Sequence, residues 1–116
     1  MEGLYRDPYN RVWGGKSING TLEITIGNNE LVIETGSKQY KITVPVRNYH
    51  TEFTTNQSGL INEMKQQSLV KSLPVEVMLG GIHQNAKFNV VVLRMTNSEG
   101  ITGLSGSFYE QWMRPE

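Results

Sequence analysis

Apolar and polar residues alternate in three consecutive segments of the first half of the chain, and this alternation constrains the fold more than any other feature. A period of two is typical of β-strands that bury one face. Gly27-Asn28-Asn29 and Gly36-Ser37 separate the segments, and Gly and Asn accept the positive φ angles of tight turns. We therefore predict three strands joined by hairpins, over residues 21–26, 31–34 and 39–44.

A helical pattern follows these strands after a polar segment. Residues 47–56 are mostly polar and are expected to form a loop. The apolar residues between positions 60 and 64 recur at the spacing of a helix, and Ser58 or Asn56 is suited to cap its amino end. Because the apolar phase then breaks, we predict that the helix ends near Ser68.

The second half of the chain adds further strands. Residues 75–79 alternate like the first three segments, whereas residues 88–95 are apolar on both faces, which indicates a central strand. A short strand over residues 101–104 is expected next. Ser107 and Glu110 then fit the capping box of a closing helix.

The resulting order of three strands, a helix and two strands is that of the OB-fold. This fold is a five-stranded antiparallel Greek-key barrel with its helix between the third and fourth strands. We therefore predict a mainly β, OB-like barrel over residues 20–116, with an optional short helix at its C-terminal end. Residues 1–19 are rich in turn formers and are expected to be an N-terminal arm. A generic α+β sandwich with the same element order is the alternative.

Composition narrows the classes of protein that the chain can belong to. The absence of cysteine excludes disulfide scaffolds, zinc ribbons and thiol catalysis. No apolar run approaches the ~18 residues of a membrane span, and the N-terminal residues lack the pattern of a signal peptide. We therefore predict a cytoplasmic protein, in the host cytoplasm if it is viral, that does not bind membranes.

The sequence contains no residue pattern that is typical of catalysis or of metal binding. Gly14-Gly15-Lys16-Ser17 resembles the end of a phosphate-binding P-loop, but Asn10 stands where the first glycine of that motif belongs and a β-pattern follows in place of a helix. His50 and His83 lie in different predicted loops. Serines and carboxylates show no pairing suited to acid–base or nucleophilic work. We predict a protein that is not an enzyme and holds no cofactor.

Aromatic and basic residues interleave in three parts of the chain and suggest a surface for single-stranded nucleic acid. Such proteins stack bases on aromatic rings and follow the phosphates with cations. The candidate nucleic-acid-binding residues are Arg11, Trp13, Lys38, Tyr40, Lys41, Arg47, Tyr49 and Lys87. Each residue also has a simpler explanation. Tyr40 shares its phase with buried-type residues, for example, and an outward lysine commonly serves solubility alone.

With this element order and these residues, the chain resembles the small single-domain single-stranded-DNA-binding proteins of bacteriophages over residues 21–96. The resemblance implies non-catalytic binding of single-stranded DNA in replication or recombination. Bacterial-type relatives end in an acidic tail that recruits other enzymes, and Gln111–Glu116 does not have that character. We also expect a homodimer that buries apolar residues such as Met78 or Trp112.

Two alternative functions remain open at this point. Eleven acidic and eleven basic side chains give zero net charge, which argues against binding driven by counterion release from DNA. It favours a protein-binding module, such as a phage inhibitor, an immunity protein or a virion part. Carbohydrate recognition by the same barrel face is the third interpretation.

Overall fold

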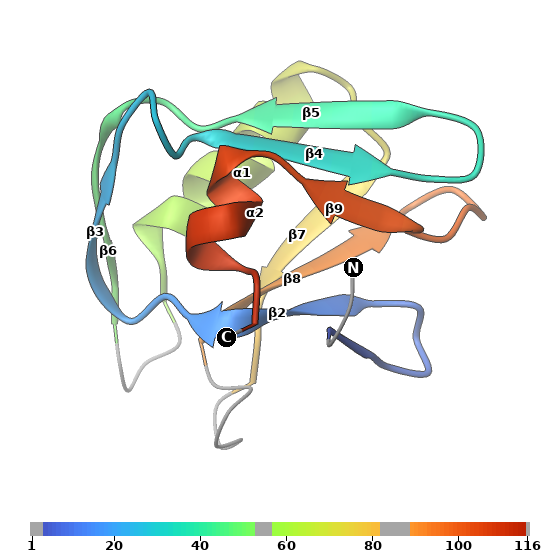
Figure 1. Ribbon diagram of the computed structural model, residues 1–116, viewed down its shortest axis with the longest axis horizontal. Coiled ribbons are helices and arrows are strands. Elements are labelled where there is room, and N and C mark those ends of the chain that lie inside the picture. Colours follow the sequence, from blue (N-terminus) through green and yellow to red (C-terminus); the bar gives the residue numbers. More distant parts are fainter. Residues whose placement is uncertain (1–3, 53–56, 82–88, 116) are drawn as a thin grey trace.

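Nine strands and two helices surround one apolar core in the computed structural model, which describes residues 4–52, 57–81 and 89–115 (Figure 1). The elements in chain order are β1 Tyr5–Arg6, β2 Val12–Ser17, β3 Gly20–Ile24, β4 Glu30–Glu34, β5 Gln39–Thr43, β6 Arg47–Thr51, α1 Gly59–Val70, β7 Val75–Leu79, β8 Val90–Met95, β9 Gly103–Ser105 and α2 Ser107–Trp112.

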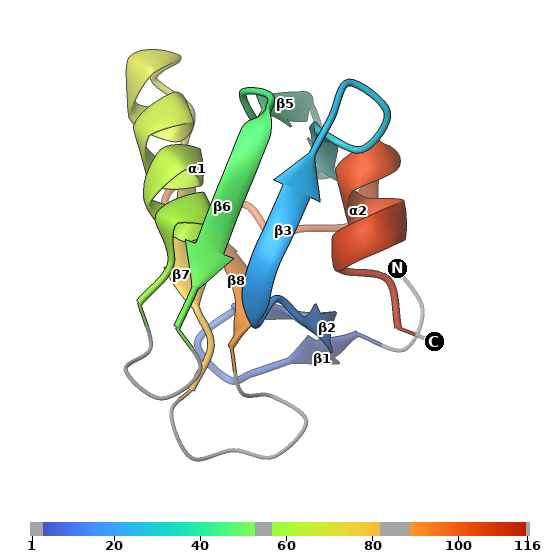
Figure 2. The same ribbon diagram turned by 90° about the vertical axis from the view of Figure 1, so that its left-hand side faces the viewer.

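The strands form three antiparallel sheets, with strand orders β1-β2-β8-β7, β3-β6 and β5-β4-β9. The predicted five-stranded OB barrel is therefore wrong, because the described residues form no closed barrel. An OB-fold also needs its first three strands to pair in succession. Here β3 pairs with β6, and β4 pairs with β5 and β9. In Figure 2, β3 and β6 lie side by side between α1 and α2.

The turn after β3 explains why the first predicted hairpin does not form. The Asn28 side chain accepts from the Thr25 backbone N–H and donates to the Glu23 carbonyl oxygen, so it bonds to backbone groups at the end of β3. Asn29 instead begins the next pair of strands, since it exchanges hydrogen bonds with Val44 beyond β5. The two asparagines therefore separate one sheet from the next.

Residues 47–51, which were expected to lie in a loop, form strand β6. Its register places Tyr49 opposite Leu22 and His50 opposite Thr21. Tyr49 and Thr51 are buried, whereas Asn48 and His50 are exposed. The period of two is thus present, but its inward members are a tyrosine and a threonine in place of aliphatic residues.

The predicted N-terminal arm contains a central part of the sheet. β2 pairs with β8, and Val12 and Ile18 lie in the core. Gly14 allows the close approach of β8, because a Cβ atom there would lie 3.1 Å from the carbonyl oxygen of Val91. Regular structure therefore begins at β1 and not at residue 21.

Helix α1 agrees with the sequence prediction at its amino end. Ser58 is the N-cap and accepts a hydrogen bond from the Ile61 N–H. Leu60, Ile61 and Met64 are buried, as their spacing predicts. The helix ends at Val70, two residues beyond the predicted end.

In the C-terminal part of the chain, the structure confirms the predicted strands but not the predicted capping box of the last helix. β7 has its predicted bounds, and β8 is central with both faces buried from Val90 to Leu93. The predicted capping box is wrong, because Gly106 occupies the N-cap of α2 with a φ of 97°. The Ser107 hydroxyl instead accepts from the Glu30 N–H and so joins α2 to β4.

The C-terminal residues close on β2. The Gly15 N–H donates to the Met113 carbonyl oxygen at 2.6 Å, and Lys16 donates to the carbonyl oxygen of Gln111. A Cβ atom on Gly15 would lie 2.7 Å from Pro115, so only glycine fits without movement. Residues almost one hundred positions apart are therefore in direct contact.

Candidate functional site

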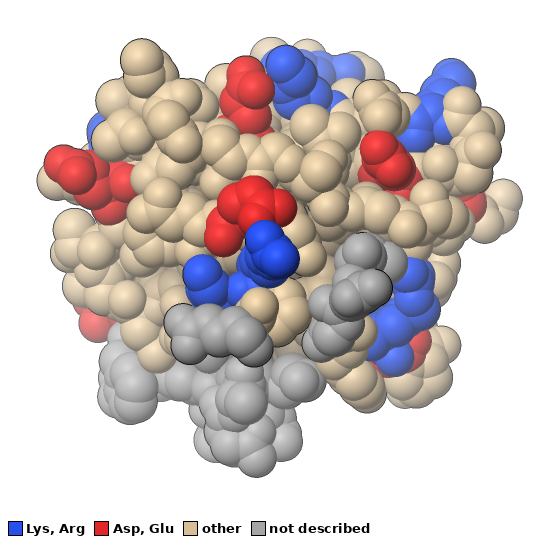
Figure 3. Space-filling view, in the orientation of Figure 1, with Lys and Arg blue, Asp and Glu red and all other residues tan. Residues whose placement is uncertain are grey.

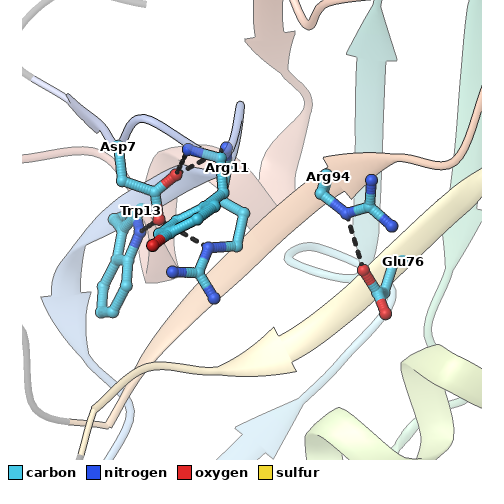
Figure 4. A network of polar contacts seen from close by, with 6 residues as sticks. Asp7, Arg11, Trp13, Glu76 and Arg94 are labelled. Carbon is cyan, nitrogen blue, oxygen red and sulfur yellow. Dashed lines mark hydrogen bonds and ion pairs between the residues drawn. The ribbon is translucent and has the colours of Figure 1, made fainter. Parts of the chain in front are cut away.

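The outer face of the four-stranded sheet, turned away from the core, carries two rows of side chains that cross all four strands. Register aligns Tyr5 with Trp13, Trp13 with Val92, and Val92 with Met78, and we call this set the aromatic row. Residues two positions apart on a strand share a face. A second row, which we call the charged row, therefore lies beside it and consists of Asp7, Arg11, Arg94 and Glu76 (Figure 4).

At the β1–β2 end of the two rows, Asp7 is the shared hydrogen-bond acceptor. It is 8% exposed and accepts hydrogen bonds from the backbone N–H groups of Tyr9 and Arg11, from Arg11 Nε at 2.5 Å and from Trp13 Nε1 at 2.9 Å. Burial by itself raises the pKa of this carboxyl. The hydrogen bonds outweigh that effect and hold the pKa of Asp7 below its ordinary value. Asp7 is therefore a carboxylate at neutral pH.

The guanidinium of Arg11 lies close to two aromatic rings. Its Cζ atom is 5.1 Å from the ring centroid of Tyr9 and 5.7 Å from that of Trp13, which is within cation–π range. Tyr5 packs against Trp13 in a T-shaped contact with centroids 6.1 Å apart. We call Tyr5, Asp7, Tyr9, Arg11 and Trp13 the aromatic–arginine cluster.

The residues of this cluster contact one another and are still accessible. Tyr9 is 71% exposed and Tyr5 is 45% exposed, whereas Trp13 is half-buried. A ligand would therefore meet the exposed rings of Tyr5 and Tyr9 beside a guanidinium and an indole that are hydrogen-bonded to Asp7. Such a surface is suited to stacking and to hydrogen bonding with acceptors.

The structure brings two of the predicted site residues, Arg11 and Trp13, into this cluster. Lys38, Tyr40 and Lys41 lie on the β4–β5 hairpin, in another sheet. Tyr40 is half-buried and packs against the core. Lys41 faces outward and forms an ion pair with Glu30 at 3.5 Å, and Lys38 is exposed at the turn.

Arg47 and Tyr49 form a separate contact on β6. Tyr49 is buried, its hydroxyl donates to the Pro45 carbonyl oxygen, and its burial raises its pKa although nearby Arg47 opposes the shift. The Arg47 guanidinium lies 5.0 Å from the ring centroid of Tyr49 and pairs with Glu63. Arg47 and Tyr49 lie in the β3-β6 sheet, whereas Tyr40 and Lys41 lie in the β5-β4-β9 sheet. Lys87 lies outside the described residues.

Acidic groups accompany the cations of the described surface. Arg11 pairs with Asp7, Arg94 with Glu76, and Arg114 with Glu110. On the face shown in Figure 3, Lys and Arg alternate with Asp and Glu, and no broad basic area appears among the described residues of that face. The field of this face is therefore mixed in sign.

Sequence reasoning missed Asp7, Arg94 and Glu76. The available signal was the spacing of Asp7 and Arg11 on either side of the Pro8–Asn10 turn, with Trp13 two residues further along. Arg94 and Glu76 could be placed beside them only once the strand order was known.

Other classes of site receive no support from the described residues. Residues 4–52, 57–81 and 89–115 contain no group of three His, Asp or Glu side chains placed to hold a metal ion. Within the same residues, neither helix has the length and apolar character needed to cross a membrane. In comparisons with known proteins, no protein-family model matches the chain, and neither a curated protein nor a solved structure is significantly similar to it.

Proposed function

We propose that this chain is a protein-binding module whose contact surface is centred on the aromatic–arginine cluster. Tyr, Trp and Arg are the residues that most often carry the binding energy of protein interfaces. The observation that supports this proposal best is that a buried carboxylate bonds Arg11 within cation–π range of the rings of Tyr9 and Trp13. The cluster has the composition of an interface hot spot, and two of its side chains, Arg11 and Trp13, are hydrogen-bonded to Asp7.

Charge supports a protein partner over a polyanion. The cation of the cluster is neutralised by Asp7, and the next arginine on the charged row is paired with Glu76. A surface of balanced charge gives little counterion-driven affinity for nucleic acid. It is well suited to the mixed polar rim of a protein interface.

Proximity labelling in the native host, followed by binding measurements with the purified partner, tests this function. We expect Tyr9→Ala to weaken the complex by about 30-fold, which corresponds to a hot-spot contribution of about 2 kcal/mol. Lys38→Ala is the matched control, because it changes an exposed residue on another sheet. A partner that binds the Tyr9 and Lys38 variants equally well would rule out the cluster as its contact surface.

Binding of single-stranded DNA is the second candidate function, and the exposed rings of Tyr5 and Tyr9 favour it. Base stacking on aromatic rings contributes about 1–3 kcal/mol per base. Titration with an oligo-dT strand, followed by tryptophan fluorescence, separates the two functions because Trp13 belongs to the cluster. Saturable binding that weakens steeply with salt would favour DNA and displace the protein-binding proposal.

A further inference from the structure

The chain passes from β2 to β3 through a short joint, and this joint contains the only Asn-Gly pair of the sequence, Asn19-Gly20 (Figure 1). The backbone nitrogen of a glycine reaches the preceding asparagine amide most easily, because glycine has no Cβ atom to obstruct the approach. Gly20 has a φ of 86°, and apart from its chain neighbours no heavy atom of the described residues lies within 4 Å of the place that a Cβ atom would occupy. Gly20 is also the first residue of β3, and the ends of strands open most readily.

The side-chain amide of Asn19 is bonded at one of its two polar atoms. Its Oδ1 accepts a hydrogen bond from Nδ2 of Asn89, which also donates to the Glu52 carbonyl oxygen at 2.8 Å. Asn89 is fully buried, and its backbone N–H and carbonyl are bonded to Gly80 and Ile18. Asn19 itself is half-buried, and none of the described residues accepts a hydrogen bond from its Nδ2. The amide oxygen therefore faces a buried donor, whereas the amide nitrogen has no protein partner among these residues.

We propose that Asn19 is a site of spontaneous deamidation in the folded chain. The Gly20 backbone nitrogen gives its proton to a solvent base and forms a bond to Cγ of Asn19. The negative charge that develops on Oδ1 is stabilised by the Asn89 amide, as a fixed donor stabilises an oxyanion in an enzyme. The Cγ–Nδ2 bond then breaks, and the nitrogen takes up a proton and leaves as ammonia. Water opens the resulting succinimide ring to aspartate or, when it attacks the backbone carbonyl carbon, to isoaspartate.

The two products should differ in their effect on the fold. Aspartate at position 19 keeps the backbone unchanged and offers Asn89 a carboxylate oxygen as acceptor. Isoaspartate adds a methylene group to the main chain between Ile18, which is fully buried, and Gly20, which pairs with Thr51. It should therefore displace β3 relative to β2 and weaken the connection between two sheets. The aromatic–arginine cluster lies toward the other end of β2, so the inference does not depend on the proposed function.

Incubation of the native protein at mildly alkaline pH, followed by peptide mapping with mass spectrometry, tests the site. Aspartate and isoaspartate should appear at Asn19 before any other asparagine changes, and at least as fast as in a synthetic peptide of residues 15–24. Asn97 is the internal control, because it is exposed but precedes a serine. Asn19→Gln is the matched variant and should stay unmodified, since its longer side chain would have to close a larger ring. Slower conversion of Asn19 in the native protein than in the peptide would overturn the proposal.

Asn89→Gly tests the donor. Asn89 has a φ of 53°, which glycine adopts without strain, so the variant removes the side-chain amide and keeps the backbone conformation accessible. Deamidation at Asn19 should slow by about 10-fold, the factor that corresponds to the loss of one hydrogen bond. Circular dichroism verifies that the variant is folded. Conversion of Asn19 in the folded variant at the parent rate or faster would contradict the role of Asn89, and if the variant does not fold, the comparison of native protein with peptide decides the proposal.

Discussion

The β1–β2 and β4–β5 hairpins contain the same kinds of residue and use them differently. On the β4–β5 hairpin, Tyr40 turns its ring toward the core and Lys41 points outward to Glu30. On the β1–β2 hairpin, the exposed ring of Tyr9 and the half-buried ring of Trp13 both lie within cation–π range of Arg11. The first set serves the fold, whereas the second forms an ordered surface.

The difference depends on one buried acceptor. Asp7 fixes Arg11 and Trp13 by direct hydrogen bonds from their side chains. Lys41 meets its carboxylate through a single exposed ion pair, and such pairs contribute little order or stability. A cation near a ring therefore becomes a candidate site when a buried group holds both of them.

The largest expected effect belongs to the core side of β5. Ile42→Ala should lower the free energy of unfolding by about 2–5 kcal/mol, because it removes a fully buried side chain and leaves a cavity. Urea denaturation measures the change. Tyr9→Ala, on the other hairpin, should alter stability by no more than about 1 kcal/mol. Equal losses of unfolding free energy in the two variants would contradict the view that the β4–β5 hairpin supports the core and the β1–β2 hairpin forms a surface.

Asp7→Asn should have the next largest effect. At neutral pH it should lower the free energy of unfolding by about 1–3 kcal/mol, because buried donors lose a charged acceptor. The pKa of Asp7 is lowered on folding, so its stabilising effect is present above the unfolded pKa of about 3.9 and is lost as pH falls through the folded-state pKa. Denaturation curves recorded from neutral to strongly acidic pH should show the two proteins converging. A difference that stays constant with pH would show that Asp7 acts through packing alone.

Tyr49→Phe should have a smaller effect, about 0.5–1.5 kcal/mol, since it removes one hydrogen bond to the Pro45 carbonyl oxygen and keeps the ring. The phenol should resist ionisation in the folded protein, because burial raises the pKa of Tyr49. Ultraviolet pH titration of parent and variant isolates this group. A phenol at position 49 that titrates at its ordinary pKa would indicate an exposed ring.

Lys41→Ala should have the smallest effect. An exposed ion pair contributes about 0–1 kcal/mol, so the free energy of unfolding should change within that range and less at high salt. The same denaturation series at two salt concentrations checks this. Should the loss approach that of Asp7→Asn, the two ion pairs would not differ as their burial suggests.

Local pattern predicted most of the strands but not their partners. Strands such as β4 and β7 alternate between aliphatic and polar residues, and their positions follow from that period alone. β6 was missed because Tyr49 and Thr51 occupy its buried positions. The pairing of β3 with β6 depends on how Asn28 bonds to the end of β3, and no periodicity contains that information.

The candidate site was predictable only in part, for a related reason. Arg11 and Trp13 stood out by residue type. Asp7 did not, because an aspartate beside a proline ordinarily indicates a solvated turn. Its burial follows from the closure of the β1–β2 hairpin over it, which is a tertiary event. Tyr40 and Tyr49 were equally conspicuous in the sequence, and the fold turned both toward the interior.

The closure of the C-terminal residues over Gly15 has a consequence for synthesis of the chain. β2 is made early, yet it is completed by β8 on one side and by the Met113 carbonyl oxygen at its end. β4 likewise pairs with β9 and donates a hydrogen bond to the hydroxyl of Ser107, and both of these partners come late in the chain. Contacts between such distant residues form slowly. On the ribosome, the β1–β2, β3–β6 and β4–β5 pairs can therefore form within the first half of this chain, whereas β2 and β4 each lack one neighbouring strand until β8 and β9 have been synthesised.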